Sequence, residues 1–115
     1  VMSQRLVRLT CVNCREPETV DPHVRQTLGV APDEQFFIGR GCPQCDGLGV
    51  HKRQAVYELL VVSPEIRKLI VANAEADSIH ALAIAEGMTP ITQAAVRIAR
   101  EGKISLLEAW RVRSD

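Results

Sequence analysis

The feature that most constrains this chain of 115 residues is a pair of C-x-x-C motifs, Cys11–Cys14 and Cys42–Cys45, separated by residues 15–41. Two intervening residues let the backbone turn so that both sulfurs of a motif face one point, and two such motifs can supply four thiolates to one tetrahedral ion. The stretch 39–49 around the second motif holds four glycines and Pro43 but few apolar side chains. A hydrophobic core cannot hold such a stretch in shape, so we expect a metal ion to do so.

The expected metal is a structural zinc ion held by Cys11, Cys14, Cys42 and Cys45. Because protein sulfurs fill all four positions, the site would have no vertex open to water or substrate. Iron in a rubredoxin-like site is the main competitor, since thiolate ligands alone do not separate the two metals. Four inert thiols are a further alternative. Basic residues near the cysteines in the sequence could offset the net charge of the cluster: Arg15, Arg40, Lys52 and Arg53.

The amino-acid composition limits the partners and the location that we expect for this chain. Fourteen basic and fourteen acidic residues cancel, so no net charge draws the chain to nucleic acid or anionic lipid. It lacks an apolar run of the roughly 18 residues needed to span a bilayer, and no secretion signal is evident. We therefore expect a cytoplasmic location, no nucleic-acid partner and no direct membrane span. A stand-alone zinc-ribbon module that binds a protein or nucleic-acid partner is the alternative function.

Catalytic motifs are missing from the sequence. It contains no G-x-x-x-x-G-K-[ST] phosphate loop, no G-x-G-x-x-G motif and no G-x-S-x-G motif. The three histidines lie in different segments, and only His51, beside the second motif, is a candidate for contacting a partner. We expect no catalytic residue in this chain and no enzymatic activity from it alone.

The pattern of residues predicts an α+β fold, in which a small zinc-knuckle segment with short strands precedes a helical region of about four helices. We expect three parts: residues 1–9, 10–53 and 54–115. Met2, Leu6 and Leu9 follow a helical spacing, so 1–9 is expected to be the end of a helix. In 54–115, residues 54–62 are rich in β-formers and predict a strand.

Capping residues and glycines predict where the helices begin and end. Asp21 and Pro22 predict a short helix that ends at Gly29, and residues 35–39 a brief strand after it. Later helices are expected after Ser63, over 76–87 and after Thr89, and Ser105 with Glu108 forms a capping box for the last one. Glu58, at an alternating position of the predicted strand 54–62, is expected to point away from the core and to pair with a nearby arginine.

Three stretches together resemble one family. They are "QRLVRLTCVNCREP" (4–17), "GRGCPQCDGLGVHKRQAVYELLVVSPEIRKLI" (39–70) and "EGMTPITQAAVRIAREGKISLLEAWRV" (86–112). Their order and both cysteine pairs resemble the C-terminal part of the ATPases of type II secretion and type IV pilus assembly, the general secretory pathway protein E group. Residues 42–49 also resemble a cysteine-rich repeat of heat-shock co-chaperones, but Cys11 and Cys14 lack the glycines of that repeat.

The resemblance implies that this chain is part of a hexameric ATPase that powers protein secretion or pilus assembly. ATP and Mg²⁺ would then bind only in the full-length parent, upstream of residue 1. The expected partners are the ATPase core, neighbouring subunits of the homohexamer and inner-membrane platform proteins, which would place the chain at the cytoplasmic side of that membrane. After the second motif the family usually reads G-Y-[KR]-G-R, whereas residues 49–53 read G-V-H-K-R. Arg53 is retained, and the resemblance makes it a candidate for contacting a neighbouring subunit or its nucleotide.

Overall fold

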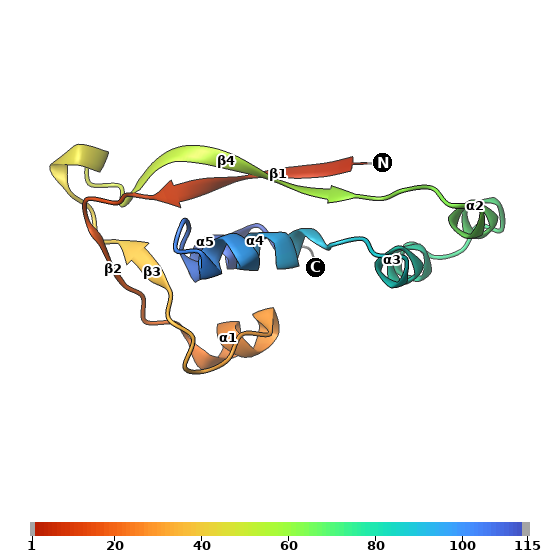
Figure 1. Ribbon diagram of the computed structural model, residues 1–115, viewed down its shortest axis with the longest axis horizontal. Coiled ribbons are helices and arrows are strands. Elements are labelled where there is room, and N and C mark those ends of the chain that lie inside the picture. The colour runs from red at the N-terminus through yellow and green to blue at the C-terminus, as the bar shows by residue number, and fades with distance from the viewer. Residues whose placement is uncertain (1, 114–115) are drawn as a thin grey trace.

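The chain is organised around a long antiparallel ribbon of two strands, β1 (Met2–Thr10) and β4 (Val50–Leu59) (Figure 1). The structure is a computed structural model that describes residues 2–113. A second, much shorter pair consists of β2 (Arg15–Pro17) and β3 (Phe37–Gly39). The other elements are α1 (Pro22–Leu28), the 3-10 turn η1 (Pro43–Cys45), α2 (Pro64–Val71), α3 (Ala76–Ala85), α4 (Ile91–Arg100) and α5 (Leu106–Arg111). These elements confirm the predicted α+β class, with four helices after β4.

The helix expected over residues 1–9 is wrong, because Met2–Thr10 forms strand β1. Within β1 the fully buried Val7 and the half-buried Leu9 face the interior and alternate as in a strand, while Thr10 and Cys11 at its end are both buried. Met2 and Leu6, on which the helical spacing was based, are about half exposed. The partner strand begins 40 residues beyond the end of β1, so no local pattern signals the pairing.

A bulge interrupts the ribbon close to the cysteines. Arg8 lies opposite Arg53 and Thr10 lies opposite Val50, so β4 carries one residue more than β1 between these two pairs. Lys52, in this extra stretch, has a φ of 66°, a left-handed conformation that is unfavourable for a residue with a side chain. The bulge therefore falls where the sequence departs from the family pattern, and Lys52 stands in place of that pattern's second glycine.

One face of the ribbon packs on α4 and α5, and α1 closes the other side of these helices (Figure 1). The helix expected after Thr89 is α4, and an apolar stripe along it faces the core: Ile91, Ala95 and Ala99 are buried, and Ala94 and Ile98 pack against them. The buried core cluster comprises Val7, Val30, Phe36, Val56, Ile91, Ala95, Val96, Ala99, Ile104, Leu106, Ala109 and Val112. Aliphatic residues dominate this core, as the composition requires.

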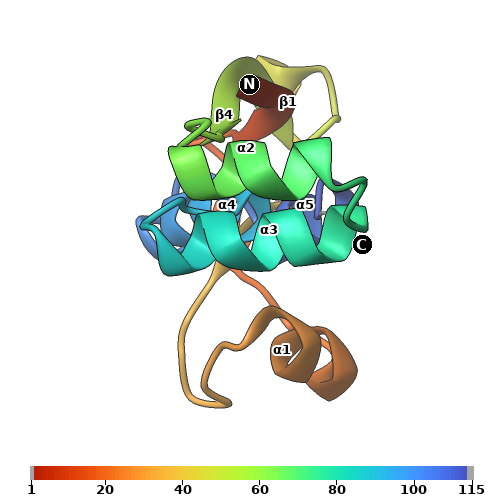
Figure 2. The ribbon, with the colours of Figure 1, turned by 90° about the vertical axis from the view of Figure 1, so that its right-hand side faces the viewer.

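Helices α2 and α3 lie side by side at the far end of the molecule, beyond the ribbon (Figures 1 and 2). Ile66 and Ala83 are the residues that they bury. The helix starts agree with the capping signals: the side chains of Asp21, Ser63 and Ser105 each accept a hydrogen bond from the first turn of α1, α2 and α5. The result is an elongated molecule of 54 × 28 × 18 Å. The end of β1 and the start of β4, which adjoin the cysteines, lie toward one end, and the α2–α3 pair lies at the other (Figure 1).

Candidate functional site

The two C-x-x-C motifs form turns that meet at the end of the ribbon. The first knuckle, Cys11–Cys14, directly follows β1, and the second, Cys42–Cys45, contains η1 and precedes β4. The backbone holds the turns together, since the amide of Cys11 donates to the carbonyl of Gly49 at 3.0 Å and the amide of Arg40 to that of Cys14 at 3.2 Å. Within the second knuckle, Gly47 has a φ of 76° and its amide donates to the carbonyl of Cys42 at 2.9 Å.

The glycines around the second knuckle permit a close approach of two backbone segments. A Cβ atom on Gly39 would lie 1.9 Å from the carbonyl oxygen of Gly49, and one on Gly41 would lie 2.7 Å from that of Gly47. Both distances are shorter than any tolerable contact, so a side chain at either position would force the segments apart. The glycines thus let residues 39–41 approach 47–49, which closes the base of the second knuckle.

The four sulfurs lie in an arrangement that suits a tetrahedral ion. The Sγ atoms of Cys11 and Cys42 are 3.8 Å apart, those of Cys14 and Cys45 are 3.8 Å apart, and those of Cys42 and Cys45 are 3.7 Å apart. All four lie within 4.8 Å of one another, and none forms a disulfide. Zinc–sulfur bonds of about 2.3 Å give a tetrahedron with edges of about 3.8 Å. The residues present therefore fit a four-coordinate metal.

Hydrogen-bond donors surround the sulfurs. The side chain of Asn13 donates to Sγ of Cys42 at 3.2 Å, and the amides of Gly41 and Gly49 donate to Sγ of Cys14 and Cys45 at 3.3 and 3.2 Å. The Asn13 bond is the main cause that lowers the pKa of Cys42 to about 6. Burial raises the pKa of Cys14 to about 11. A bound cation would deprotonate both thiols.

Hydrogen-bond donors also set the pKa of the Cys45 thiol. Burial acts to raise the pKa of this thiol, but the amides of Cys42 and Gly49 outweigh burial and lower it. Cys11, Cys14 and Cys45 are buried, whereas Cys42 is half-buried. Such amide donors satisfy thiolate lone pairs and fix their direction, as outer-shell partners do in metal sites. Asn13 was missed in the sequence, because a residue between the cysteines carries no signal of its own.

Of the basic residues expected to offset the thiolates, Arg15 packs elsewhere, whereas Lys52 and Arg53 lie next to Cys45. The guanidinium of Arg15 lies over the ring of Phe37, 4.7 Å from its centroid, and donates to the carbonyl of Gly102. His51, Lys52 and Arg53 are exposed on β4 and line a shallow hollow next to Cys45. Within residues 2–113, the direct donors to the sulfurs are amides and not cationic side chains.

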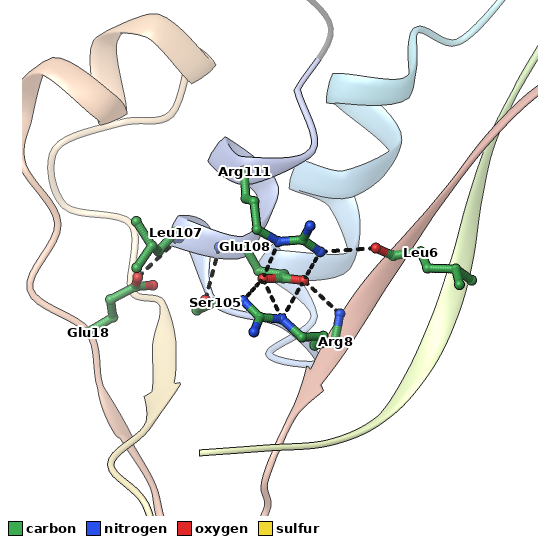
Figure 3. A network of polar contacts seen from close by, with 7 residues as sticks. All are labelled: Leu6, Arg8, Glu18, Ser105, Leu107, Glu108 and Arg111. Carbon is green, nitrogen blue, oxygen red and sulfur yellow. Dashed lines mark hydrogen bonds and ion pairs between the residues drawn. The ribbon is translucent and has the colours of Figure 1, made fainter. Parts of the chain in front are cut away.

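A second polar centre covers the open edge of β1 (Figure 3). The carboxylate of Glu108 on α5 is 4% exposed and accepts from the backbone amide of Arg8 at 2.7 Å. It also binds the guanidinium of Arg8 at 3.0 Å and that of Arg111 at 2.6 Å, while Arg111 donates to the carbonyl of Leu6 at 3.1 Å. We call these four residues the edge network. Burial acts to raise the pKa of Glu108, but donors from Arg111 and Arg8 outweigh it and lower that pKa to about 2.

The capping box predicted for α5 is therefore half right. Ser105 does accept from the amide of Glu108, but the Glu108 side chain turns to β1 instead of reaching back to Ser105. A distant residue adds to the cap: the carboxylate of Glu18 accepts from the amides of Leu106 and Leu107 at 2.8 and 3.1 Å. Burial raises the pKa of Glu18 despite these donors.

Glu58 also corrects an expectation. It does not pair with an arginine but accepts from the amide of Ile91 at 2.9 Å and contacts Nε2 of His80 at 3.3 Å. The N-terminus of α4 has no capping side chain of its own, since Pro90 precedes it. Glu58 thus caps α4 from β4 and links it to α3.

The fold and the sulfur cluster define a small α+β module whose four cysteines can hold a metal ion. Residues 1–111 match the family model described as "Type II/IV secretion system protein". The chain therefore belongs to the Type II/IV secretion system protein family.

Named relatives support this membership. The chain is 38% identical over 112 residues to "Type IV pilus assembly ATPase PilB" of Thermus thermophilus, a match that covers 94% of this chain and 13% of that protein. It is 32% identical over 114 residues to "Type II secretion system protein E" of Aeromonas hydrophila, covering 97% of this chain and 23% of that protein. The chain thus spans less than a quarter of the length of these relatives. Every helix within residues 2–113 is too short or too polar to cross a membrane.

Proposed function

We propose that this chain is the zinc-binding C-terminal part of a hexameric ATPase that powers protein secretion or pilus assembly. Its role is structural, and it couples subunits of the ring without a nucleotide site of its own. The observation that carries this proposal is the convergence of four cysteine sulfurs, at tetrahedral spacing, in a member of the secretion family. We place the ATP and Mg²⁺ site in another part of the parent protein, because the relatives named above are several times longer than this chain and this sequence contains no phosphate-loop motif.

Zinc is the proposed metal, and Cys11, Cys14, Cys42 and Cys45 are its ligands. Four protein sulfurs complete a tetrahedral shell, so the ion has no open position for water or substrate and serves a structural purpose. The cluster closes the end of the β1–β4 ribbon and fixes the segment between the knuckles, which contributes Val30 and Phe36 to the core. Metal binding therefore stabilises both the knuckles and the packing of α4 and α5. An iron centre would differ by its visible absorption.

The proposed partners are the upstream ATPase core, neighbouring subunits of the homohexamer and inner-membrane platform proteins. The corresponding location is the cytoplasm, peripheral to the inner membrane through those partners. Arg53 is a proposed contact between subunits: its side chain is exposed and stands beside the metal centre. The relatives named above are ATPases of pilus assembly or proteins of type II secretion, which supports either system for the parent.

The test uses the longer protein that contains this chain. Cys14→Ser combined with Cys45→Ser is expected to release the metal and to reduce ATP turnover and ring assembly. The matched control is Val12→Ser, which changes a residue of the first knuckle that is 87% exposed and binds no metal. Unchanged turnover and assembly in the metal-free double variant would contradict the coupling role. Calorimetry of the 115-residue chain adds a second check, since tight ATP binding by it would contradict the absence of a nucleotide site.

A further inference from the structure

Three arginines surround a hollow on the ribbon, and one of them is Arg53, the proposed contact between subunits. Arg8 on β1, Arg53 on β4 and Arg111 at the end of α5 line a cavity of about 320 Å³, together with Leu6. Arg8 and Arg53 stand directly opposite each other across the two strands. The amide of Arg8 points away from β4, toward Glu108, so this is a pair without mutual backbone hydrogen bonds. Side chains in such pairs approach each other most closely, and like charges there are destabilising.

The carboxylate of Glu108 does not balance this charge. Its two oxygens already accept from the amide and guanidinium of Arg8 and from the guanidinium of Arg111 (Figure 3). Arg53 is exposed, and within the described residues 2–113 no carboxylate pairs with it. Three guanidinium charges against one carboxylate charge leave a local excess of two positive charges beside the cavity.

We propose that this cavity, which we call the arginine site, binds a phosphate group. A phosphate dianion matches the excess of two positive charges, whereas a single carboxylate would leave one uncompensated. Guanidinium groups offer paired, planar donors that suit phosphate oxygens. The bulge at Lys52 immediately precedes Arg53, and bulges re-aim a neighbouring side chain out of the regular ladder. The inference rests on the charges and register of this chain. It shares Arg53 with the proposed contact between subunits and does not depend on the identity of the metal.

The experiment titrates the purified, metal-loaded chain with inorganic phosphate at neutral pH. Binding is followed by the guanidinium resonances in NMR spectra and by the unfolding temperature, with acetate at equal ionic strength as the anion control. Phosphate is expected to bind saturably and to raise the unfolding temperature, and added salt is expected to weaken it. Acetate is expected to produce a smaller effect.

Two variants test the role of the arginine pair. Arg53→Gln is expected to weaken phosphate binding about tenfold, because one charged hydrogen-bond partner is lost. Since Arg53 opposes Arg8, the same change should leave the stability of the phosphate-free chain equal or raised, so a loss of folding cannot explain the result. The matched control is Arg5→Gln, which removes an exposed arginine from the opposite face of β1 and should bind phosphate as the wild type does.

Phosphate binding that is absent, unsaturable or equal in Arg53→Gln and wild type would overturn the proposal. Comparing inorganic phosphate with ADP identifies the source of the group. Equal affinities are expected, because arginines and a single leucine line the cavity and leave no surface for a base. Tighter binding of ADP would still support the arginine site, but it would make a nucleotide the source and contradict the absence of a nucleotide site under the proposed function.

Discussion

Replacing Glu108 with glutamine tests whether the edge network holds α5 against the ribbon. The carboxylate is 4% exposed and receives N–H donors from two guanidinium groups and one backbone amide. Its pKa of about 2, compared with 4.5 for an ordinary glutamate, corresponds to about 3 kcal/mol at about 1.4 kcal/mol per pH unit. Removal of one partner from a buried ion pair costs roughly 3–5 kcal/mol by a separate argument. We therefore expect Glu108→Gln to lower the free energy of unfolding by about 3 kcal/mol.

The assay is urea unfolding of the metal-loaded chain at neutral pH, followed by the fluorescence of Trp110. This residue is the single tryptophan and lies on α5, next to Arg111. The matched control is Glu101→Gln, which breaks an exposed pair with Lys103 at 3.1 Å and should cost less than about 1 kcal/mol. A loss in Glu108→Gln no larger than that in the control would refute the reasoning.

The same variant has a defined dependence on pH. Because the folded-state pKa of Glu108 lies below its ordinary value, the stabilisation is fully present above pH 4.5 and disappears as the pH falls toward about 2. The difference in unfolding free energy between wild type and Glu108→Gln should therefore be constant from neutral pH down to about pH 5 and shrink below it. Acid release of the metal affects both proteins equally and cancels in the difference. A difference in unfolding free energy that grows as the pH falls would contradict this account.

Three further changes probe single contacts. Lys52→Gly should raise the free energy of unfolding by about 1 kcal/mol in urea melts, because glycine adopts the φ of 66° without strain; a loss of stability would argue against the bulge. Gly39→Ala should lower the metal affinity in chelator competition, since its Cβ would collide with the carbonyl of Gly49, and an unchanged affinity would contradict the close approach. Glu58→Ala should lower the free energy of unfolding by about 1 kcal/mol, because it removes the cap of α4. Calorimetric melting measures this loss, and a melting temperature equal to that of the wild type would exclude the cap.

Local signals in the sequence predicted most of the fold. The starts of α1, α2 and α5 were found because Asp21, Ser63 and Ser105 cap them through residues only two or three positions away. The helix after Thr89 was predictable because its apolar residues recur with the period of a helix. The strand β1 was missed because Val7 and Leu9 alternate over too few residues to outweigh the helical spacing of Met2 and Leu6, and because its partner is distant in the sequence.

The candidate site likewise combines features that the sequence predicted with features that it did not. The spacing of the cysteines predicted their convergence, since each pair is local and the tetrahedral ion needs four ligands. The contacts of Glu58 and Glu108 were not predictable from the sequence, because each carboxylate reaches an element more than 30 residues away. The charge offset assigned to the basic residues near the cysteines also followed sequence proximity. Arg15 instead packs on Phe37, whereas Lys52 and Arg53 do lie next to Cys45.

The central claim is that four cysteine sulfurs hold one structural zinc ion, and the metal content of the purified chain tests it most directly. Mass spectrometry of the reduced, native chain with its metal retained, together with elemental analysis, should show one zinc per chain and no free thiol reactive toward an aromatic disulfide. Cys45→Ser should lose the zinc, whereas Val12→Ser should keep it. A native chain without bound metal, with four reactive thiols, would contradict the account.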